Sequence, residues 1–237
     1  MQTVVAKSDT YVYPPRSKSA LPRHETAMLA DFGWIANYKF NDSHLLLKLL
    51  PNDVEFWGRK GERLAYRPDN RLVAELRAAQ DILGLDRDQY HLLDGGLLDS
   101  RHPSIKDVVV IWDILVRDGE HLLGSTYKQR CSLLMGVMPH NDSWFYRHQD
   151  HDPIDFGVRL TDNVFMPRSY SSPDWTDMWH NVDVVNKPYT DSSGKVSPVL
   201  EGLMFKDING KLEYGFRENN NTHFMVRSRV TTRRHHF

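Results

Sequence analysis

The sequence predicts an α+β fold in which antiparallel β-sheets are flanked by helices. Residues 45–50 and 106–116 are apolar runs of strand length, which is typical of strands that are buried on both faces. Residues 71–83 instead place their apolar side chains at helical spacing, and Gly84 marks the end of that helix. Towards the C-terminus, Asn-Gly and Asn-rich turns separate short β-forming segments, which favours antiparallel neighbours.

Length and composition indicate an ordinary globular chain. With 237 residues, of which 40% are hydrophobic and 26% charged, the chain is long enough for one large, well-packed domain. No apolar run approaches the ~20 residues that a bilayer-spanning helix needs, and the N-terminus lacks the apolar core of a secretory signal. The single cysteine, Cys131, excludes an intramolecular disulfide and fits a reducing compartment. We therefore expect a cytoplasmic protein that makes no membrane contact.

The net charge of -1 does not by itself indicate a nucleic-acid-binding protein, but the basic residues are unevenly distributed. Residues 227–236 contain four arginines and two histidines and no acidic residue. Such a run is compatible with phosphate contacts, although a solvated chain end is the more common explanation.

The other elements follow from local composition and turn signals. The elements expected from the N-terminus onwards are an extended arm at 1–24, a short helix at 24–32 ended by Gly33, a strand containing Lys39, a hairpin strand at 54–58, a strand at 90–98 interrupted at 94–96, a helix at 126–134, and strands at 199–206, 211–216 and 223–230. Trp175 and Trp179 are four residues apart, which allows them to share one helix face.

Residues 139–198 are rich in His, Asp, Pro and aromatic residues and show little periodicity. His140 and the segment 148–152 have the density of imidazoles and carboxylates that a transition-metal site requires. Adjacent residues rarely point at one ion, however, so a polar loop is the better explanation of this cluster.

Lys39 is the candidate nucleophile. It ends a run of mixed apolar residues and precedes the polar residues 41–44, so it lies at the boundary between a strand and a turn. Desolvation at such a place can lower the pKa of a lysine and make it reactive. The alternative is a surface lysine before a turn, because exposed lysines are the rule.

Short segments along residues 34–230 together resemble those of the covalent nucleotidyltransferases, the class that contains ATP-dependent DNA ligases, RNA ligases and mRNA capping enzymes. The segments, in chain order, are Lys39-Phe-Asn-Asp42, Phe56-Trp-Gly-Arg-Lys-Gly61, Leu93-Asp-Gly-Gly-Leu97, Val110-Ile-Trp-Asp-Ile-Leu115, Leu200-Glu-Gly-Leu-Met-Phe-Lys-Asp207 and Phe224-Met-Val-Arg-Ser-Arg229. Singly these segments are weak signals, but their order and spacing make the set specific.

The resemblance implies an adenylyltransferase domain of the ATP-grasp-like type over residues 25–237, without the small C-terminal OB-fold domain. It implies ATP and Mg²⁺ as cofactors and a lysyl-AMP intermediate. The residues that it assigns are Lys39, Arg59, Lys206, Arg227 and Arg229 to catalysis; Asn37, Tyr38, Lys39, Arg59, Trp112, Glu201 and Lys206 to the nucleotide; and Glu201 and Asp94 to the metal. Trp112 would stack on adenine, and core packing is the alternative for this side chain.

The chain departs from the family pattern at several of these positions. Asn41 replaces an Asp, Asp42 replaces a Gly, His44 replaces an Arg and Gly96 replaces a Glu. Arginines also replace both lysines of the last segment, which keeps the positive charge but changes the donor geometry.

We therefore expect a compact, phage-type ATP-dependent polynucleotide ligase that joins 5′-phosphate and 3′-hydroxyl ends of nucleic acid, with a slight preference for RNA over DNA. The protein is expected to be a monomer in the cytoplasm, or in the host cytoplasm if it is phage-encoded. Three alternatives remain at this point: an ATP-dependent DNA ligase, an adenylyltransferase that modifies something other than nucleic-acid ends, and a degenerate relative that binds nucleic acid or nucleotide without turnover.

Overall fold

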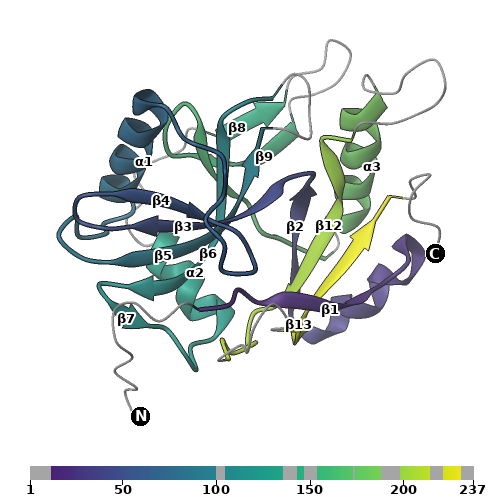
Figure 1. The fold of residues 1–237 in the computed structure, drawn as a ribbon. Helices are drawn as coiled ribbons and strands as arrows, with labels where there is room; N and C mark the ends of the chain where they lie inside the picture. The colour runs from purple at the N-terminus through teal and green to yellow at the C-terminus, as the bar shows by residue number, and fades with distance from the viewer. Residues whose placement is uncertain are drawn as a thin grey trace.

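The computed structural model describes residues 12–99, 105–135, 143–146, 154–172, 174–187, 198–213 and 221–230. Over these residues the chain forms two β-sheets with helices packed on them, which confirms the α+β fold class. Figure 1 shows one sheet on each side of the molecule, with α1 over the larger sheet and α3 beside the smaller one.

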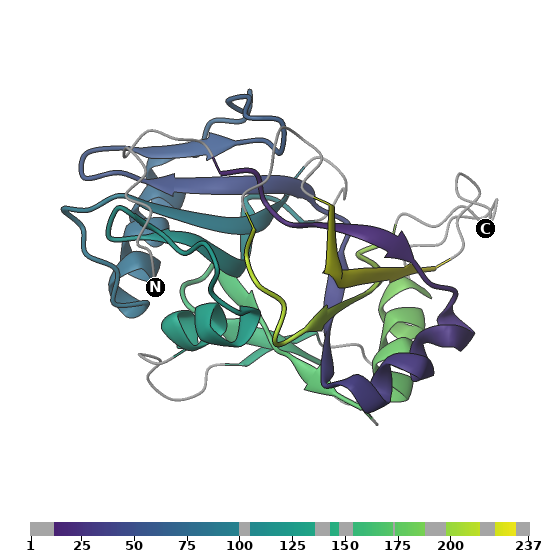
Figure 2. The same ribbon diagram turned by 90° about the horizontal axis from the view of Figure 1, so that it is seen from below.

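The smaller sheet has the strand order β1-β13-β12-β2-β11. Its strands are β1 (Arg16–Ala20), β13 (Asn221–Arg229), β12 (Leu200–Asp207), β2 (Trp34–Phe40) and β11 (Tyr170–Ser171). All neighbours are antiparallel except β1, which runs parallel to β13 at the edge (Figure 2). One face packs against α3 (Trp175–Asn186), where both tryptophans of the helix are buried in one apolar cluster as expected.

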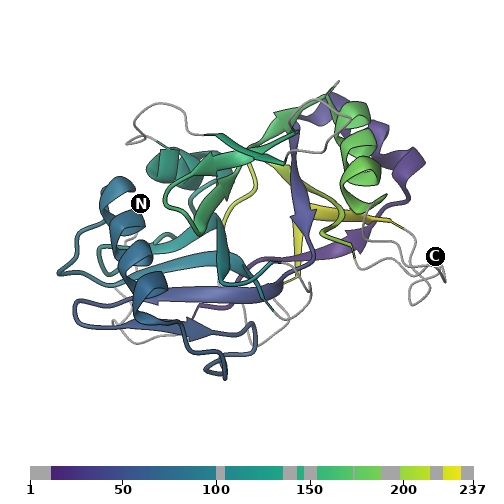
Figure 3. The ribbon, with the colours of Figure 1, turned by 90° about the horizontal axis from the view of Figure 1, so that it is seen from above.

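The larger sheet has the order β4-β3-β5-β6-β10-β9-β8, with β7 paired to β6. Its strands are β4 (Val54–Trp57), β3 (Ser43–Leu49), β5 (His91–Leu98), β6 (Val108–Arg117), β10 (Val164–Pro167), β9 (Ile154–Arg159), β8 (Ser143–Tyr146) and β7 (Glu120–His121). Leu45, Leu47 and Leu49 share an apolar cluster with α1 (Asn70–Ile82), which lies along this sheet in Figure 3. Leu46 is buried in a second cluster, so β3 is covered on both faces as the sequence predicts.

The two sheets are connected by a very short link. Strand β2 ends at Phe40 and β3 begins at Ser43, so only Asn41 and Asp42 carry the chain from one sheet to the other. The Asn41 backbone N–H donates to the Val199 carbonyl (2.9 Å), and its side-chain amide donates to the Pro198 carbonyl (3.0 Å). Lys39 therefore lies on the smaller sheet immediately before the crossing.

Several elements differ from the sequence-based expectation. Strand β5 is continuous through residues 94–96, where its pairing with β6 contains a bulge instead of a break. The helix near residue 24 is a 3₁₀ helix, Arg23–Phe32, and Gly33 ends it in the left-handed conformation (φ 70°). Residues 211–213 form no strand beyond a single bridge from Lys211 to Thr126.

The expected N-terminal arm is described from residue 12, and Arg16–Ala20 within it pair with β13 as a strand. The boundary at residue 24 stays a prediction. The His- and Asp-rich cluster at 140 and 148–152 lies outside the described residues. Among the residues that the structure describes, no helix combines the length and the apolarity needed to cross a bilayer.

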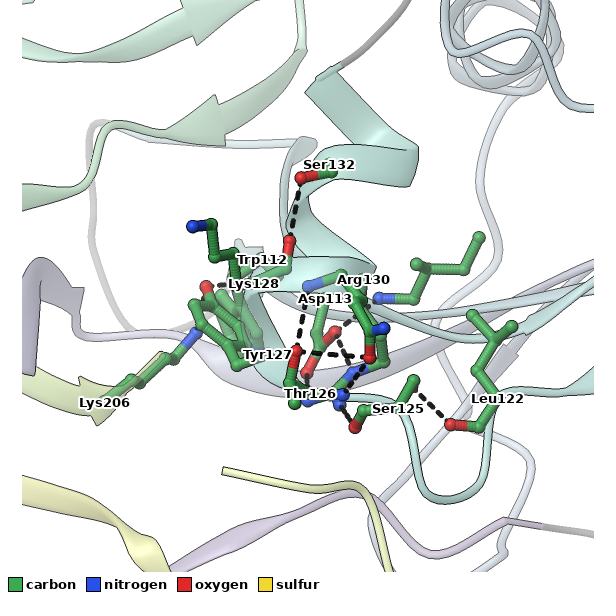
Figure 4. A network of polar contacts seen from close by, with 12 residues as sticks. Trp112, Asp113, Leu122, Ser125, Thr126, Tyr127, Lys128, Arg130, Ser132 and Lys206 are labelled. Atoms are coloured by element: carbon green, nitrogen blue, oxygen red, sulfur yellow. Dashed lines mark hydrogen bonds and ion pairs between the residues drawn. The ribbon is translucent and has the colours of Figure 1, made fainter. Parts of the chain in front are cut away.

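A buried ion pair fixes α2 (Tyr127–Met135) to β6 (Figure 4). Arg130 donates from Nε to one carboxylate oxygen of Asp113 (2.8 Å) and from Nη2 to the other (2.9 Å), and its Nη1 reaches the Ser125 carbonyl (2.6 Å). Burial alone lowers the pKa of Arg130, but the contact with Asp113 outweighs burial and raises it. Asp113 therefore holds the helix behind Trp112. Both of its carboxylate oxygens accept hydrogen bonds from Arg130.

Removing one partner of this pair leaves a buried charge without compensation. We expect Asp113→Ala to lower the free energy of unfolding by about 3–5 kcal/mol in urea denaturation, whereas the apolar double variant Asp113→Leu/Arg130→Met recovers most of the loss. Asp81→Ala, which breaks an exposed pair with Arg87, is the matched control and should leave the midpoint nearly unchanged. If Asp113→Ala unfolded at the same urea concentration as wild type, the Asp113–Arg130 pair would not stabilise the fold as proposed.

Candidate functional site

A pocket lies between the two sheets, and every residue assigned to the site from sequence lines it except Glu201. Strands β1, β2, β12 and β13 form one wall, and β3, β5 and β6 together with the turn after β4 form the other. Asp42, in the link between the sheets, also lines the pocket.

Strand alternation explains which side chains face this pocket. On β2, Asn37 and Lys39 face it, whereas Ala36 and Phe40 are buried in the cluster beneath α3. Cross-strand pairing places Lys39, Gly202 and Arg229 in one row, because Gly202 of β12 pairs with both of the others. The next row contains Asn37, Met204 and Arg227. The smaller sheet thus presents two cross-strand rows to the pocket, in which the polar side chains lie on β2 and β13 and β12 contributes Gly202 and Met204 between them.

Glu201 does not line the pocket itself, but its carboxylate contacts two pocket-lining cations because the strand is irregular at this point. Strict alternation would place it on the core side with Leu203 and Phe205, which are fully buried. The pairing of β12 with β2 instead shifts between Leu200 and Gly202, and Gly202 has φ 140°. A Cβ at Gly202 would lie 2.1 Å from the Ser228 carbonyl oxygen, so only glycine fits here.

The redirected carboxylate binds two cations. Glu201 Oε2 lies 2.5 Å from Lys39 Nζ and 3.2 Å from Arg229 Nη2. The side chains of Lys39 and Glu201 are only 15% and 17% exposed, so the pair is held in a largely desolvated place. The nucleophile assigned from sequence and its potential proton acceptor are therefore in direct contact.

Arginine side chains gather around this pair. Arg16, Arg59, Arg227 and Arg229 all line the pocket. Burial first, and then the charges of the other three arginines, lower the pKa of Arg227. Burial is also the main cause of the lowered pKa of Arg59, and Arg16 and Arg229 add to it. Like charges at this density favour an anionic ligand such as a polyphosphate.

Arg59 contacts His44, which lies at the start of β3 in the second wall of the pocket. Its Nη2 lies 3.0 Å from His44 Nδ1, and because arginine only donates, this nitrogen accepts and the imidazole carries its proton on Nε2. Nε2 lies 3.1 Å from Asp94 Oδ1, but the angles are not those of a hydrogen bond. His44 thus lies between Arg59 and the buried Asp94 carboxylate.

Lys206 lies at the base of the pocket and is almost fully buried (3% exposed). Figure 4 shows it pointing at Tyr127: Nζ donates to the Tyr127 hydroxyl (2.8 Å) and lies 4.3 Å from the ring centroid. The hydroxyl in turn donates to the Trp112 carbonyl (3.1 Å). Burial lowers the pKa of Lys206 and raises that of Tyr127. The network joins the cationic wall to the strand that carries Trp112.

Asn37 and Tyr38 differ in how they contribute. The Asn37 amide donates to the Arg168 carbonyl and to Ser169 Oγ, both at 3.0 Å. The ring of Tyr38 is buried against Phe156 and Tyr170, and burial raises the pKa of Tyr38 to about 12. Its side chain therefore supports β2 from the core, and a nucleotide contact from Tyr38 would be made by its backbone.

Unsatisfied polar atoms test whether ATP and Mg²⁺ fit. Among the described residues, the buried side-chain atoms without a hydrogen-bond partner include Asn37 Oδ1, His44 Nε2, Arg59 Nε, Asp94 Oδ1 and Arg229 Nε, all on pocket-lining residues. This mixture of donors and acceptors suits a nucleotide with a base, a sugar and phosphates.

No cluster of three His, Cys, Asp or Glu side chains able to hold a metal occurs within the described ranges. Mg²⁺ usually needs only one or two carboxylates together with substrate phosphates, so Glu201 and Asp94 remain its predicted ligands.

Sequence reasoning missed Arg16 and Ser17 of β1 and the two methionines, Met204 and Met225. The methionines share their strand faces with Lys206 and Arg227, and the period of two could have identified them. Arg16 had no such signal, because its strand pairs with residues more than 200 positions later.

No protein-family model and no curated protein matches this chain in sequence. Solved structures are similar in fold. One is mycobacterial DNA ligase D complexed with ATP and MES, with a TM-score of 0.51 and 17% identity over 92% of this chain and 60% of that one. Another is the ligase domain from M. tuberculosis LigD, with a TM-score of 0.50 and 18% identity over 91% of this chain and 58% of that one.

The chain therefore spans about three fifths of the length of these two structures. It has the fold of the nucleotidyltransferase domain of ATP-dependent DNA ligases.

Proposed function

We propose that this protein is an ATP-dependent polynucleotide ligase that joins 5′-phosphate and 3′-hydroxyl ends through AMP bound covalently to Lys39. The observation that carries the proposal is the Lys39–Glu201 pair facing a cluster of four arginines. The pair supplies a nucleophile with a neighbouring base, and the arginines supply charge for phosphates. The fold shared with DNA ligase domains supports the same reaction class.

In the first step Lys39 Nζ attacks the α-phosphorus of ATP. A nitrogen–phosphorus bond forms, the bond to the β-phosphate oxygen breaks, and pyrophosphate leaves. Nζ is the donor in its contact with Glu201, so attack requires that its proton move away, and Glu201 is the carboxylate placed to take it. Arg59, Arg227, Arg229 and Lys206 balance the charge that develops on the phosphates.

In the next two steps a 5′-phosphate oxygen of the nucleic acid displaces Lys39 from AMP, and a 3′-hydroxyl then displaces AMP to seal the strand. Mg²⁺, held through Glu201 and Asp94 together with phosphate oxygens, would neutralise phosphate charge. Asn37 Oδ1 offers an acceptor to the adenine amino group, and Trp112 offers a ring to the base.

We expect the wild-type protein to become labelled when it is incubated with α-labelled ATP and Mg²⁺ and separated on a denaturing gel. Lys39→Ala removes the attacking amine and should abolish the label, whereas Lys106→Ala, outside the pocket, should keep it. A protein that binds nicked duplexes without ever being labelled would instead be a degenerate binding protein.

Substrate choice is tested on nicked duplexes that differ only in whether the 3′-hydroxyl strand is RNA or DNA. The Arg227-Ser-Arg229 segment and the long gap between the segments that end at Leu115 and begin at Leu200 resemble those of RNA-repairing ligases, so we expect faster sealing of the RNA strand. Equal or faster sealing of DNA would remove that preference. Joining of neither, in a protein that still forms lysyl-AMP, would indicate an adenylyltransferase with another acceptor.

The burial of Lys206 predicts a pH-dependent stability. Its pKa lies below the ordinary 10.5, so the folded chain holds this proton less tightly than the unfolded chain does. The resulting cost to stability is present at neutral pH and disappears as the pH rises towards 10.5. We expect Lys206→Met to be more stable than wild type at about pH 7, with a difference that shrinks at alkaline pH in urea titrations.

The same Lys206→Met substitution should reduce self-labelling, since it removes a positive charge from the lining of the pocket. A variant whose stability falls equally at both pH values would show that the contact with Tyr127 outweighs desolvation.

A further inference from the structure

We propose that Asp42 binds the ribose hydroxyls of ATP. Its side chain occupies the space that a side chain at position 96 would otherwise fill. The proposal rests on the proposed function in taking ATP as the ligand. It assigns to the link between the sheets a carboxylate that position 96 of β5 does not carry.

Asp42 and Gly96 compete for one volume. A Cβ added to Gly96 would lie 2.7 Å from Asp42 Cγ, 2.8 Å from Asp42 Cβ and 2.9 Å from Trp112 Cη2. Gly96 does not have a positive φ, so its backbone conformation accepts any residue. Space alone therefore keeps this position a glycine, and Asp42 occupies most of that space.

This competition connects two departures from the family pattern that look independent in the sequence. The chain has Asp where the similar family has Gly, at position 42, and Gly where the family has Glu, at position 96. The two positions have exchanged a small and an acidic residue across a shared volume. The pocket keeps one carboxylate at this place, presented from the link instead of from β5.

The surroundings of Asp42 fit a sugar better than a phosphate. Lys39, Arg227 and Arg229 lie together on the smaller sheet, whereas Asp42 is beside the Trp112 ring of the larger one. A carboxylate repels phosphate oxygens but accepts hydrogen bonds from hydroxyl groups. With the base against Trp112 and the phosphates on Lys39, Arg227 and Arg229 of the smaller sheet, the ribose would lie at Asp42.

Titration calorimetry with ATP, 2′-dATP and 3′-dATP tests the assignment without requiring catalysis. A hydrogen bond to a charged acceptor predicts that wild type binds at least one deoxynucleotide about tenfold more weakly than ATP, and that this ratio falls to near one in Asp42→Gly. Asp42→Asn keeps the shape and removes the charge, and it should lower the ratio as well. Asp162→Gly, an exposed carboxylate between β9 and β10, should retain it.

The exchange itself is tested by moving the carboxylate back. Gly96→Glu alone should lower the thermal midpoint because its Cβ meets Asp42, and the double variant Asp42→Gly/Gly96→Glu should recover part of the midpoint, since the contact with Trp112 remains, together with the preference for ATP. If the double variant folds but prefers ATP over the deoxynucleotides no more than Asp42→Gly does, a glutamate at position 96 cannot replace Asp42, and the proposed exchange is wrong.

An unchanged ratio in Asp42→Gly and Asp42→Asn would overturn the ribose assignment, as would equal wild-type binding of all three nucleotides. If the protein binds ATP more tightly than the deoxynucleotides but is never labelled covalently, the ribose assignment holds and the proposed ligase activity is rejected.

Discussion

The contact between Lys39 and Glu201 is the interaction on which the candidate site depends. It exists because β12 departs from regular pairing at one residue, which turns a carboxylate from the core side of the sheet to the pocket side. The backbone of Gly202 makes that turn possible, since any side chain there would collide with the neighbouring strand. A local irregularity thus creates the chemistry, and the regular strands around it hold the partners in place.

The pocket is built from two walls of different character. The smaller sheet contributes cations in cross-strand rows, and the other wall contributes the Trp112 ring, His44, the buried Asp94 carboxylate and Arg59. Burial first, and the charges of neighbouring arginines second, lower the pKa of Arg59 and of Arg227, so holding these two guanidinium groups in the pocket costs stability in the folded chain. Such a cost is tolerated where a ligand removes it, which is the usual compromise between stability and function.

Much of the fold was predictable because apolar runs and turn residues are local signals. Strands β3, β6, β12 and β13 and helix α1 lie close to where the sequence places them. The glycines at 95 and 96 were misleading: they suggested a break, but they lie in a continuous strand because close neighbours occupy the places of their side chains.

The site was predictable to the extent that its residues belong to motifs. Lys39, Arg59 and Glu201 are part of short segments and could be proposed together. Arg16 could not, because only the long-range pairing of β1 with β13 brings it to the pocket. The competition between Asp42 and Gly96 was equally inaccessible, since the two residues are separated by more than fifty positions and are brought together only by the pairing of β3 with β5.

The two-residue link between the sheets has a consequence for motion. The backbone and the side chain of Asn41 donate hydrogen bonds to the segment before β12. The connection between Lys39 and β3 therefore has little conformational freedom. A hinge at this point would have to break those bonds, and the nucleophile would move with it. The site is accordingly preorganised: in the proposed reaction ATP would meet a lysine and a carboxylate at a nearly fixed separation, and little reorganisation would be needed before the attack.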